Sequence, residues 1–258
     1  MLRTVTVTRY VSPLREGGSL PAIVEADDDG MYVLKFRGAG QGPKALIAEL
    51  VSGELARAIG LPVPELVFAE LDPVLARTEP DPEIQDLIRA SGGLNLGMDY
   101  LPGSLPFDPV ADSVEPGLAS SVVWFDALTC NVDRTPRNTN LLLWHNALWM
   151  IDHGASLYVH HGNETFADRA GDSFVAIRDH VLLPIATKLR ETGESLSSPA
   201  AEAVQRVARL IPDAWLKSAH PSADPVRLRE EYQLYLSERL RQPQAFLEES
   251  IRAHDLLI

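Results

Sequence analysis

A polar loop followed at once by a tight β-hairpin constrains this chain more than any other part of its sequence. The loop covers residues 131–140 and carries Asp133 and Asn138, which are five residues apart. Two short apolar runs within residues 141–151 then predict two strands joined by a turn. Because a hairpin brings the end of its second strand back beside the start of its first, Asp152 must lie next to the polar loop. The sequence therefore places three oxygen-bearing side chains close together.

The region before this unit is rich in strand patterns and contains one long amphipathic helix. Alternating Thr and Val near the start, and apolar runs around an Asp-Asp-Asp-Gly turn at residues 27–30, predict an antiparallel meander. Residues 44–59 place Leu, Ile and Val at helical spacing, and Gly60 ends this helix. The strands expected here cover residues 3–12, 22–26, 31–36, 67–71 and 94–101, and a short helix is expected at 84–90.

The region after residue 116 has a mostly helical pattern apart from the loop and the hairpin. Helices are expected over residues 116–129, 180–190, 199–210 and 226–256. Pro102-Gly103 interrupts the pattern between the two regions and marks the expected boundary. We therefore expect an α+β fold with a β-rich N-terminal lobe over residues 1–101 and a mostly helical C-terminal lobe over residues 102–258.

Charge and cysteine content argue against several classes of protein. The formal net charge is −13 and the pI is about 4.9, whereas nucleic acids and anionic membrane surfaces attract Lys and Arg. Cys130 is the single cysteine, so no intrachain disulfide can form, and we expect a small buried residue. The adjacent His160 and His161 point in opposite directions on an extended segment, which favours a loop pair over a metal site.

The start of the chain has no apolar core typical of a signal peptide. No apolar run approaches the ~18 residues that a membrane span needs. We therefore expect a cytoplasmic protein without direct contacts to membrane or nucleic acid.

Lys35 is the first residue whose position suggests chemistry. It is one of four lysines and lies within an apolar strand, where a buried charge needs a partner. Glu49 on the following helix can supply that partner, and Glu54 on the same helix is the competing candidate. The alternative is that Lys35 lies on a strand edge and faces water.

The order of the polar residues suits phosphoryl transfer. This reaction needs a cation on the nucleotide phosphates, a carboxylate that holds the cation, a base near the acceptor hydroxyl, and oxygen ligands for Mg²⁺. Asp133 and Asn138 have the spacing that kinase catalytic loops use for the base and the metal-binding amide. Asp152-His153-Gly154 stands where kinases have Asp-Phe-Gly, so Asn138 and Asp152 can share one Mg²⁺. For each residue alone, an ordinary turn Asp or Asn is the alternative.

These motifs resemble the HipA-like kinases, distant relatives of the protein kinases that include bacterial toxin kinases. Ala48-Glu49 with Leu55-Ala56 is similar to a helix of that family and favours Glu49 over Glu54. The segment from Asn131 to Asn138 resembles its catalytic loop, and Ile151-Asp152-His153-Gly154 resembles its metal-binding strand end. The resemblance covers roughly residues 12–190.

The resemblance implies a bilobal protein-kinase-like fold and an enzyme that uses ATP and Mg²⁺. It implies that Lys35, held by Glu49, binds the phosphates. It further implies that Asp133 is the base and that Asn138 and Asp152 bind Mg²⁺.

Two further segments are candidates for contacts with ATP. Gly17, Gly18 and Ser19 in the first hairpin would cover the phosphates. In the family that the chain resembles, phosphorylation of a loop serine can switch the enzyme off, so Ser19 is also a candidate regulatory site. Residues 98–101 would form the hinge between the lobes, where the backbone of Asp99 and Leu101 could bind adenine.

Departures from the kinase pattern leave the acceptor open. A Gly-x-Gly-x-x-Gly loop is absent, Arg137 stands where many relatives have Lys, and no Ala-Pro-Glu segment follows Asp152. With 258 residues, we expect no room for the extra N-terminal subdomain of full-length toxin kinases. A protein Ser or Thr is the expected acceptor, and an antitoxin-type protein is a candidate partner.

Three other functions stay open on the same residues. The Asp-Arg…Asn arrangement is also similar to phosphatidylinositol 3- and 4-kinases, so a lipid or small-molecule hydroxyl is an alternative acceptor. A non-catalytic pseudokinase and a transferase that moves AMP are the remaining alternatives. A pseudokinase usually lacks one of the Lys, Asp or metal-ligand positions, whereas all of them are present here.

Overall fold

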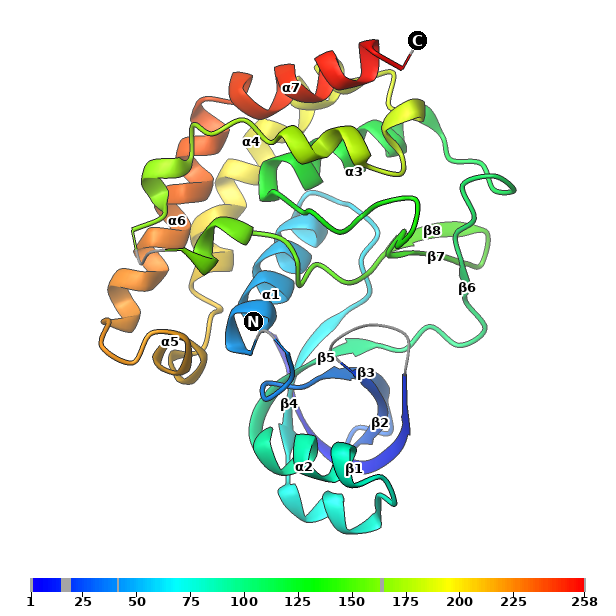
Figure 1. Ribbon diagram of the computed structural model, residues 1–258, viewed down its shortest axis with the longest axis vertical. Helices are drawn as coiled ribbons and strands as arrows, with labels where there is room; N and C mark the ends of the chain where they lie inside the picture. The colour runs from blue at the N-terminus through cyan, green and yellow to red at the C-terminus, as the bar shows by residue number, and fades with distance from the viewer. Residues whose placement is uncertain (1, 15–19, 41, 163–164, 258) are drawn as a thin grey trace.

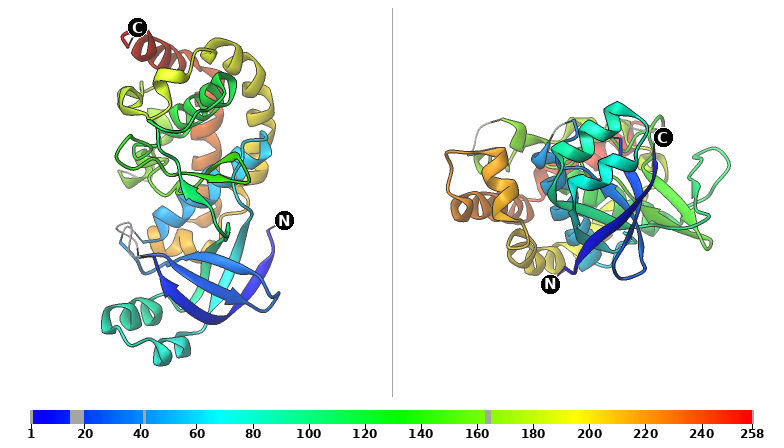
Figure 2. Two further views of the ribbon diagram at one scale, coloured as in Figure 1. Left: turned by 90° about the vertical axis from the view of Figure 1, so that its right-hand side faces the viewer. Right: turned by 90° about the horizontal axis from the view of Figure 1, so that it is seen from below.

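The computed structural model describes residues 2–14, 20–40, 42–162 and 165–257 and has two unlike parts (Figure 1). A β-barrel with short helices at its far end forms one part, and a group of helices with the C-terminus forms the other. Figure 2 shows the two parts stacked along the long axis of the molecule. None of the helices in the described ranges is both long and apolar enough to cross a membrane.

The barrel closes in the order β1-β2-β3-β5-β4. Its strands are β1 (Thr4–Pro13), β2 (Ala22–Ala26), β3 (Met31–Lys35), β4 (Leu66–Leu71) and β5 (Gly93–Asp99). The predicted antiparallel meander of the first three strands is confirmed. The sequence did not predict the parallel pairing of β1 with β4, which closes the barrel. Each of the five described barrel strands therefore has a neighbouring strand on both sides.

Small and branched apolar side chains fill the barrel. Val5, Val24 and Leu34 point inward and are almost completely buried. At Gly97 a Cβ would lie 2.9 Å from Val67 Cγ2, so a residue without a Cβ suits this position, where β5 lies between β3 and β4. The short helices η1 (Pro73–Thr78) and α2 (Pro82–Ala90) cover the far end of the barrel through their buried apolar side chains.

The second and larger core lies among the helices. It is built by α1 (Pro43–Ala58), α3 (Pro116–Thr129), α4 (Leu189–Ala208), α5 (Asp213–Ala219), α6 (Pro225–Arg241) and α7 (Gln244–Asp255). Trp215 on α5 connects this core to the barrel, because its indole N–H donates to the Leu94 carbonyl at 3.0 Å and its ring meets Phe68 edge-on.

Helix α1 is internal rather than a surface helix of the barrel. Residues 46–53 are all buried, and the helix contacts α4 and α5 as well as β4 and β5. From its place in the chain we expected it to belong to the β-rich lobe, but its apolar residues are part of the larger core. A helix that is buried on all sides lies inside the protein, and α1 thus packs between the barrel and the helices α4 and α5. The lobe boundary at residues 101 and 102 stays a prediction.

The helix predicted over residues 180–190 is not present. The chain instead makes the short turns η4 (Val175–Asp179) and η5 (Leu183–Ile185), and α4 begins only at Leu189. Pro184 lacks a backbone N–H and suits such a tight turn, which explains why an apolar run of helical spacing does not form an α-helix here. The predicted helix over 226–256 is two helices, α6 and α7, separated at Gln242-Pro243.

Arg239 on α6 is a completely buried cation that joins three segments. Its guanidinium donates to the carbonyl oxygens of Ala127 and Leu128, in the last turn of α3, and to those of Ala170 and Asp172. The C-terminal turn of a helix carries partial negative charge and therefore favours a cation. Arg239 thus adds donors to the last turn of α3, beside the cap that the Cys130 N–H makes with the Asp126 carbonyl, and fixes α3 to α6.

Arg239→Met should lower the free energy of unfolding by about 3 kcal/mol or more, because buried carbonyl groups lose their donors. Arg241→Met on the same helix is the matched control. Arg241 is 68% exposed and pairs with Glu238 at the surface, so we expect a change below about 0.5 kcal/mol. Urea denaturation of both variants measures the two values, and equal losses would contradict this role of Arg239.

Candidate active site

The predicted hairpin is present and brings Asp152 beside the polar loop. Strands β7 (Leu141–Trp144) and β8 (Ala147–Met150) pair along their whole length, and the turn residues His145 and Asn146 have positive φ values of 49° and 61°. Both values are those of a two-residue turn that matches strand twist. At the open end, the Ile151 N–H donates to the Asn140 carbonyl at 3.0 Å, so the residue before Asp152 is bonded to the end of the loop.

Lys35 connects the barrel to the two carboxylates expected near it. Its Nζ lies 2.7 Å from Glu49 Oε2 and 2.5 Å from Asp152 Oδ1. The predicted ion pair between Lys35 and Glu49 is confirmed, and the competing Glu54 pairs with Arg57 instead. The Lys35 side chain is 12% exposed and that of Glu49 only 1%, whereas that of Asp152 is 43% exposed. The cluster therefore has a buried side and a side that is open to a ligand.

The opposite charges of this cluster stabilise the charged forms of Lys35 and Glu49. Burial alone would lower the pKa of Lys35, but attraction to Asp152 and then Glu49 raises it above its ordinary range. Burial alone would raise the pKa of Glu49, but the charge of Lys35 holds it well below its ordinary value of 4.5. His153, completely buried, places Nδ1 3.6 Å from Glu49 Oε1, a contact too long for a hydrogen bond. Lys35 and Glu49 therefore stay charged at neutral pH.

Asp133 is oriented by three asparagines. Its Oδ2 accepts from the side-chain amides of Asn138 at 2.8 Å and Asn140 at 3.3 Å, and its backbone N–H donates to Asn131 Oδ1 at 3.1 Å. Thr135 and Asn138 close the loop between them with two backbone hydrogen bonds. No Lys or Arg of the described residues forms an ion pair with this carboxylate, and its orientation is set by neutral amides.

One pocket of about 220 Å³ contains Lys35, Asp133 and Asp152. Its other walls come from the loop before α1, the first turn of α1, and the residues after Asp152: Phe36, Ala39, Gly40, Gly42, Ala45, Leu46, Gly154 and Ala155. Lys35 and Asp152 are 117 residues apart in the sequence, and the fold brings these two side chains into contact. Asn138 joins the site through its bond to Asp133.

The oxygen donors suit a magnesium ion that is held partly by a ligand. Asn138 uses its amide nitrogen on Asp133, which leaves its oxygen as a donor to a metal. Asp152 Oδ2 accepts no hydrogen bond from the described residues, and Oδ1 meets Lys35. No cluster of three or more His, Cys, Asp or Glu within the described ranges could hold a metal alone. Mg²⁺ commonly binds one or two protein carboxylates together with phosphate oxygens and water, and this donor set fits that pattern.

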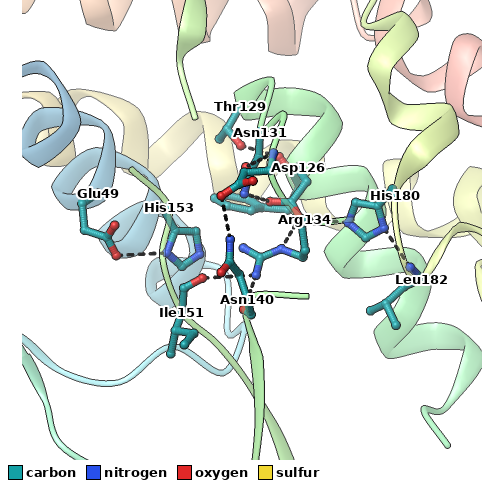
Figure 3. Close-up of polar contacts among 12 residues, drawn as sticks. Glu49, Asp126, Thr129, Asn131, Arg134, Asn140, Ile151, His153, His180 and Leu182 are labelled. Carbon is teal, nitrogen blue, oxygen red and sulfur yellow. Dashed lines mark hydrogen bonds and ion pairs between the residues drawn. The ribbon is translucent and has the colours of Figure 1, made fainter. Parts of the chain in front are cut away.

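A buried polar network behind the loop escaped the sequence-based prediction (Figure 3). Asp126 on α3 lies 2.5 Å from Arg134 Nε and 3.0 Å from His180 Nε2, and all three side chains are almost completely buried. Its other oxygen accepts from the Asn131 amide at 3.2 Å. A carboxylate within the apolar run 122–128 was the one signal in the sequence of a buried charge.

The other expected residues divide into those that the structure describes and those that it does not. Gly17, Gly18 and Ser19 lie outside the described residues, so their roles stay predictions. Asp99 ends β5 and Leu101 follows it, and binding of adenine by their backbone also stays a prediction.

Cys130 is buried, as expected, but the adjacent histidines do not lie on an extended segment. His160 and His161 are in the 3₁₀-helix η2 (Tyr158–His161), and their ring centroids are 4.6 Å apart, so the side chains do not point in opposite directions. Cys130 is buried at the end of α3 with a left-handed backbone. His160 is buried, and its Nδ1 lies 2.9 Å from the Tyr232 hydroxyl.

A sequence model described as HipA-like kinase matches residues 7–244. The chain belongs to the HipA-like kinase family. The match extends at both ends beyond residues 12–190, the range over which the motifs resemble this family. A search of curated protein sequences gives no match.

One of the solved structures that match this HipA-like kinase shows its fold. The crystal structure of the Helicobacter pylori proinflammatory kinase CtkA matches with a TM-score of 0.54 at 11% identity, over 100% of this chain and 99% of the other. The Golgi casein kinase with Mn/ADP bound matches with a TM-score of 0.48 at 11% identity, over 96% of this chain and 73% of the other. At such low identity the first match shows the fold alone. The expected bilobal protein-kinase-like fold, with a β-rich N-terminal lobe and a mostly helical C-terminal lobe, is confirmed.

Glu49 of this HipA-like kinase should make stability depend on pH in the acid range. Below about pH 4.5 the unfolded chain binds a proton at Glu49 while the folded protein, with its depressed pKa, does not. The stabilisation is therefore complete above this pH and is lost as the pH falls. Glu49→Gln should reduce the slope of unfolding free energy against pH between pH 4 and pH 3, by up to about 1.4 kcal/mol per pH unit.

Glu54→Gln is the control for this measurement. Burial raises the pKa of Glu54, so both the folded and the unfolded forms are protonated there below pH 4, and the slope should stay that of the unmodified protein. Urea denaturation in a series of buffers gives the slopes. An unchanged slope in Glu49→Gln would show that Glu49 is not held charged by Lys35.

Proposed function

We propose that the protein transfers the γ-phosphoryl group of ATP, with Mg²⁺, to a hydroxyl group, and that the hydroxyl belongs to Ser or Thr of a protein. Membership of the HipA-like kinase family supports a phosphotransferase. The observation that carries the proposal is the convergence of Lys35, Asp133 and Asp152 on one pocket from three separate segments. A cation, a base and a metal-binding carboxylate are the parts that phosphoryl transfer requires.

Lys35 is the proposed contact for the phosphates. Its ammonium group has three donors, and two of them are directed to Glu49 and Asp152, which leaves one for a phosphate oxygen. Glu49 is buried and keeps Lys35 in place from behind. The positive charge of Lys35 would neutralise part of the charge on the phosphates as the group is transferred.

Asp133 is the proposed base. The amides of Asn138 and Asn140 fix its carboxylate, so one orientation is set before the acceptor arrives. A hydroxyl at this carboxylate would be aligned for attack and would give its proton to Asp133. Asn138 and Asp152 would hold Mg²⁺, whose role when bound is to neutralise charge on the phosphate oxygens.

Asp133→Asn should bind ATP about as well as the unmodified protein but transfer phosphate about 10²–10⁴-fold more slowly, because it keeps the shape and removes the base. The measurement uses γ-labelled ATP, Mg²⁺ and a cell lysate, followed by mass spectrometry of the products. Asp86→Asn, 80% exposed on α2, is the matched control and should keep full activity.

The products of this experiment also test the acceptor. Addition of a phosphoryl group to protein Ser or Thr supports the proposal. An adenylyl group, or a labelled lipid or small molecule, would replace that part of it. Full activity in Asp133→Asn would contradict the assignment of the base.

Asp152→Ala should lose most of the gain in ATP affinity that Mg²⁺ provides, because the main hard-oxygen ligand is removed. Calorimetric titration with ATP, with and without Mg²⁺, measures this gain in the variant and in the unmodified protein. Asp86→Ala is the control, and its gain should be unchanged. The metal assignment would be wrong if Asp152→Ala kept the full effect of Mg²⁺.

A further inference from the structure

We infer that Asp126 and Arg134 are positioning residues for the transfer reaction, which set Asp133 and Asp152 relative to each other from inside the protein. This inference rests on the proposed function. Neither residue lines the pocket that holds Lys35, Asp133 and Asp152. Figure 3 shows their contacts with Asn131, Asn140 and Ile151. Asn131 in turn bonds Asp133, and Ile151 directly precedes Asp152 in the chain.

The first chain leads from Asp126 to Asp133. The Asp126 carboxylate accepts from the Asn131 side-chain amide at 3.2 Å, and its backbone carbonyl accepts from the Asn131 N–H at 2.9 Å. The Asn131 side-chain oxygen in turn accepts from the Asp133 N–H at 3.1 Å. The orientation of the loop residue that carries the base is therefore set by a carboxylate on α3.

The second chain leads from Asp126 through Arg134 to Asp152. Arg134 Nε lies 2.5 Å from Asp126, while Nη1 donates to the carbonyls of Asn140 and Ile151, the latter at 3.2 Å. Asn140 ends the loop and Ile151 directly precedes Asp152. One guanidinium thus bonds the residue before the first strand of the hairpin and the residue after its second strand. Its planar shape fixes the separation of the groups that it bonds.

The third chain holds the far end of the segment that follows Asp152. Leu182 N–H donates to His180 Nδ1 at 3.0 Å, so Nδ1 carries no proton and Nε2–H donates to Asp126 at 3.0 Å. Val181 N–H donates to the Arg134 carbonyl at 3.0 Å. The ion pair of Asp126 and Arg134 therefore holds this segment at both of its ends, at the Ile151 carbonyl and at His180. His180 is 54 residues from Asp126 in the sequence.

The geometry distinguishes positioning from simple stabilisation. Stability requires only that the two buried charges be paired or both removed. Positioning requires in addition that a planar donor reach Asn140 and Ile151 at once. Arg134→Lys keeps the charge beside Asp126 but cannot bond all of these groups. The double variant Asp126→Leu/Arg134→Met removes both charges and leaves an apolar pair.

The test compares these two variants with the unmodified protein in three measurements. They are kcat and KM for ATP, the urea midpoint of unfolding, and hydrogen exchange of the Asp133 and Ile151 amides. We expect both variants to remain folded, with kcat at least about tenfold lower, a KM for ATP within about threefold, and faster exchange at the two amides. Asp86→Leu/Arg89→Met, which removes an exposed ion pair on α2, should match the unmodified protein in all three.

The outcomes separate this inference from the proposed function. Unchanged kcat in a folded Arg134→Lys or in the folded double variant would overturn the positioning role and leave the proposed function intact. Unchanged exchange at both amides would also overturn it, whether or not any activity is seen. An unmodified protein without phosphoryl transfer would overturn the proposed function, and the kinetic part of this inference would fall with it.

Discussion

The completely buried ion pair of Asp126 and Arg134 is the constraint on which the arrangement of the site depends. Removing two charges from water costs several kcal/mol per ion, and their attraction offsets this only with good geometry and further hydrogen bonds. The donors and acceptors that meet this need come from α3, the loop, both ends of the hairpin, and His180. Of the two side chains, only Arg134 Nη2 has no partner within the described residues. These segments must therefore assemble together, because a partial arrangement would leave a charge buried and unsatisfied.

The site in front of this pair combines a fixed side with an exchangeable one. Lys35 is bonded to Glu49, which is 1% exposed, and to Asp152, which is 43% exposed. The buried contact fixes Lys35 against α1, a helix that lies between the barrel and the helical core. The exposed contact is screened by solvent and holds more weakly, so a ligand can compete for it. Lys35 can therefore keep its position against Glu49 while a ligand replaces its contact with Asp152.

Local chemistry made some of this predictable. The His145-Asn146 turn and its flanking strands placed Asp152 beside the loop, and Lys35 within an apolar strand required a nearby acid. Contacts set by the whole fold were not predictable. Thr4 pairs with Phe68 to close the barrel, and Asp126 meets His180 across 54 residues without any local pattern that announces either contact. The helix that apolar spacing predicted over residues 180–190 does not form, because Pro184 favours a tight turn at that place.

Lys35, Asp133 and Asp152 line one pocket, which we propose as the site for ATP and Mg²⁺. A crystal structure with a non-hydrolysable ATP analogue and Mg²⁺ tests it most directly. The account predicts phosphate oxygens in contact with Lys35, a metal bound by side-chain oxygens of Asn138 and Asp152, and Asp133 facing the terminal phosphate. A nucleotide bound elsewhere, or one in this pocket without contact to Lys35 or Asp152, would contradict it.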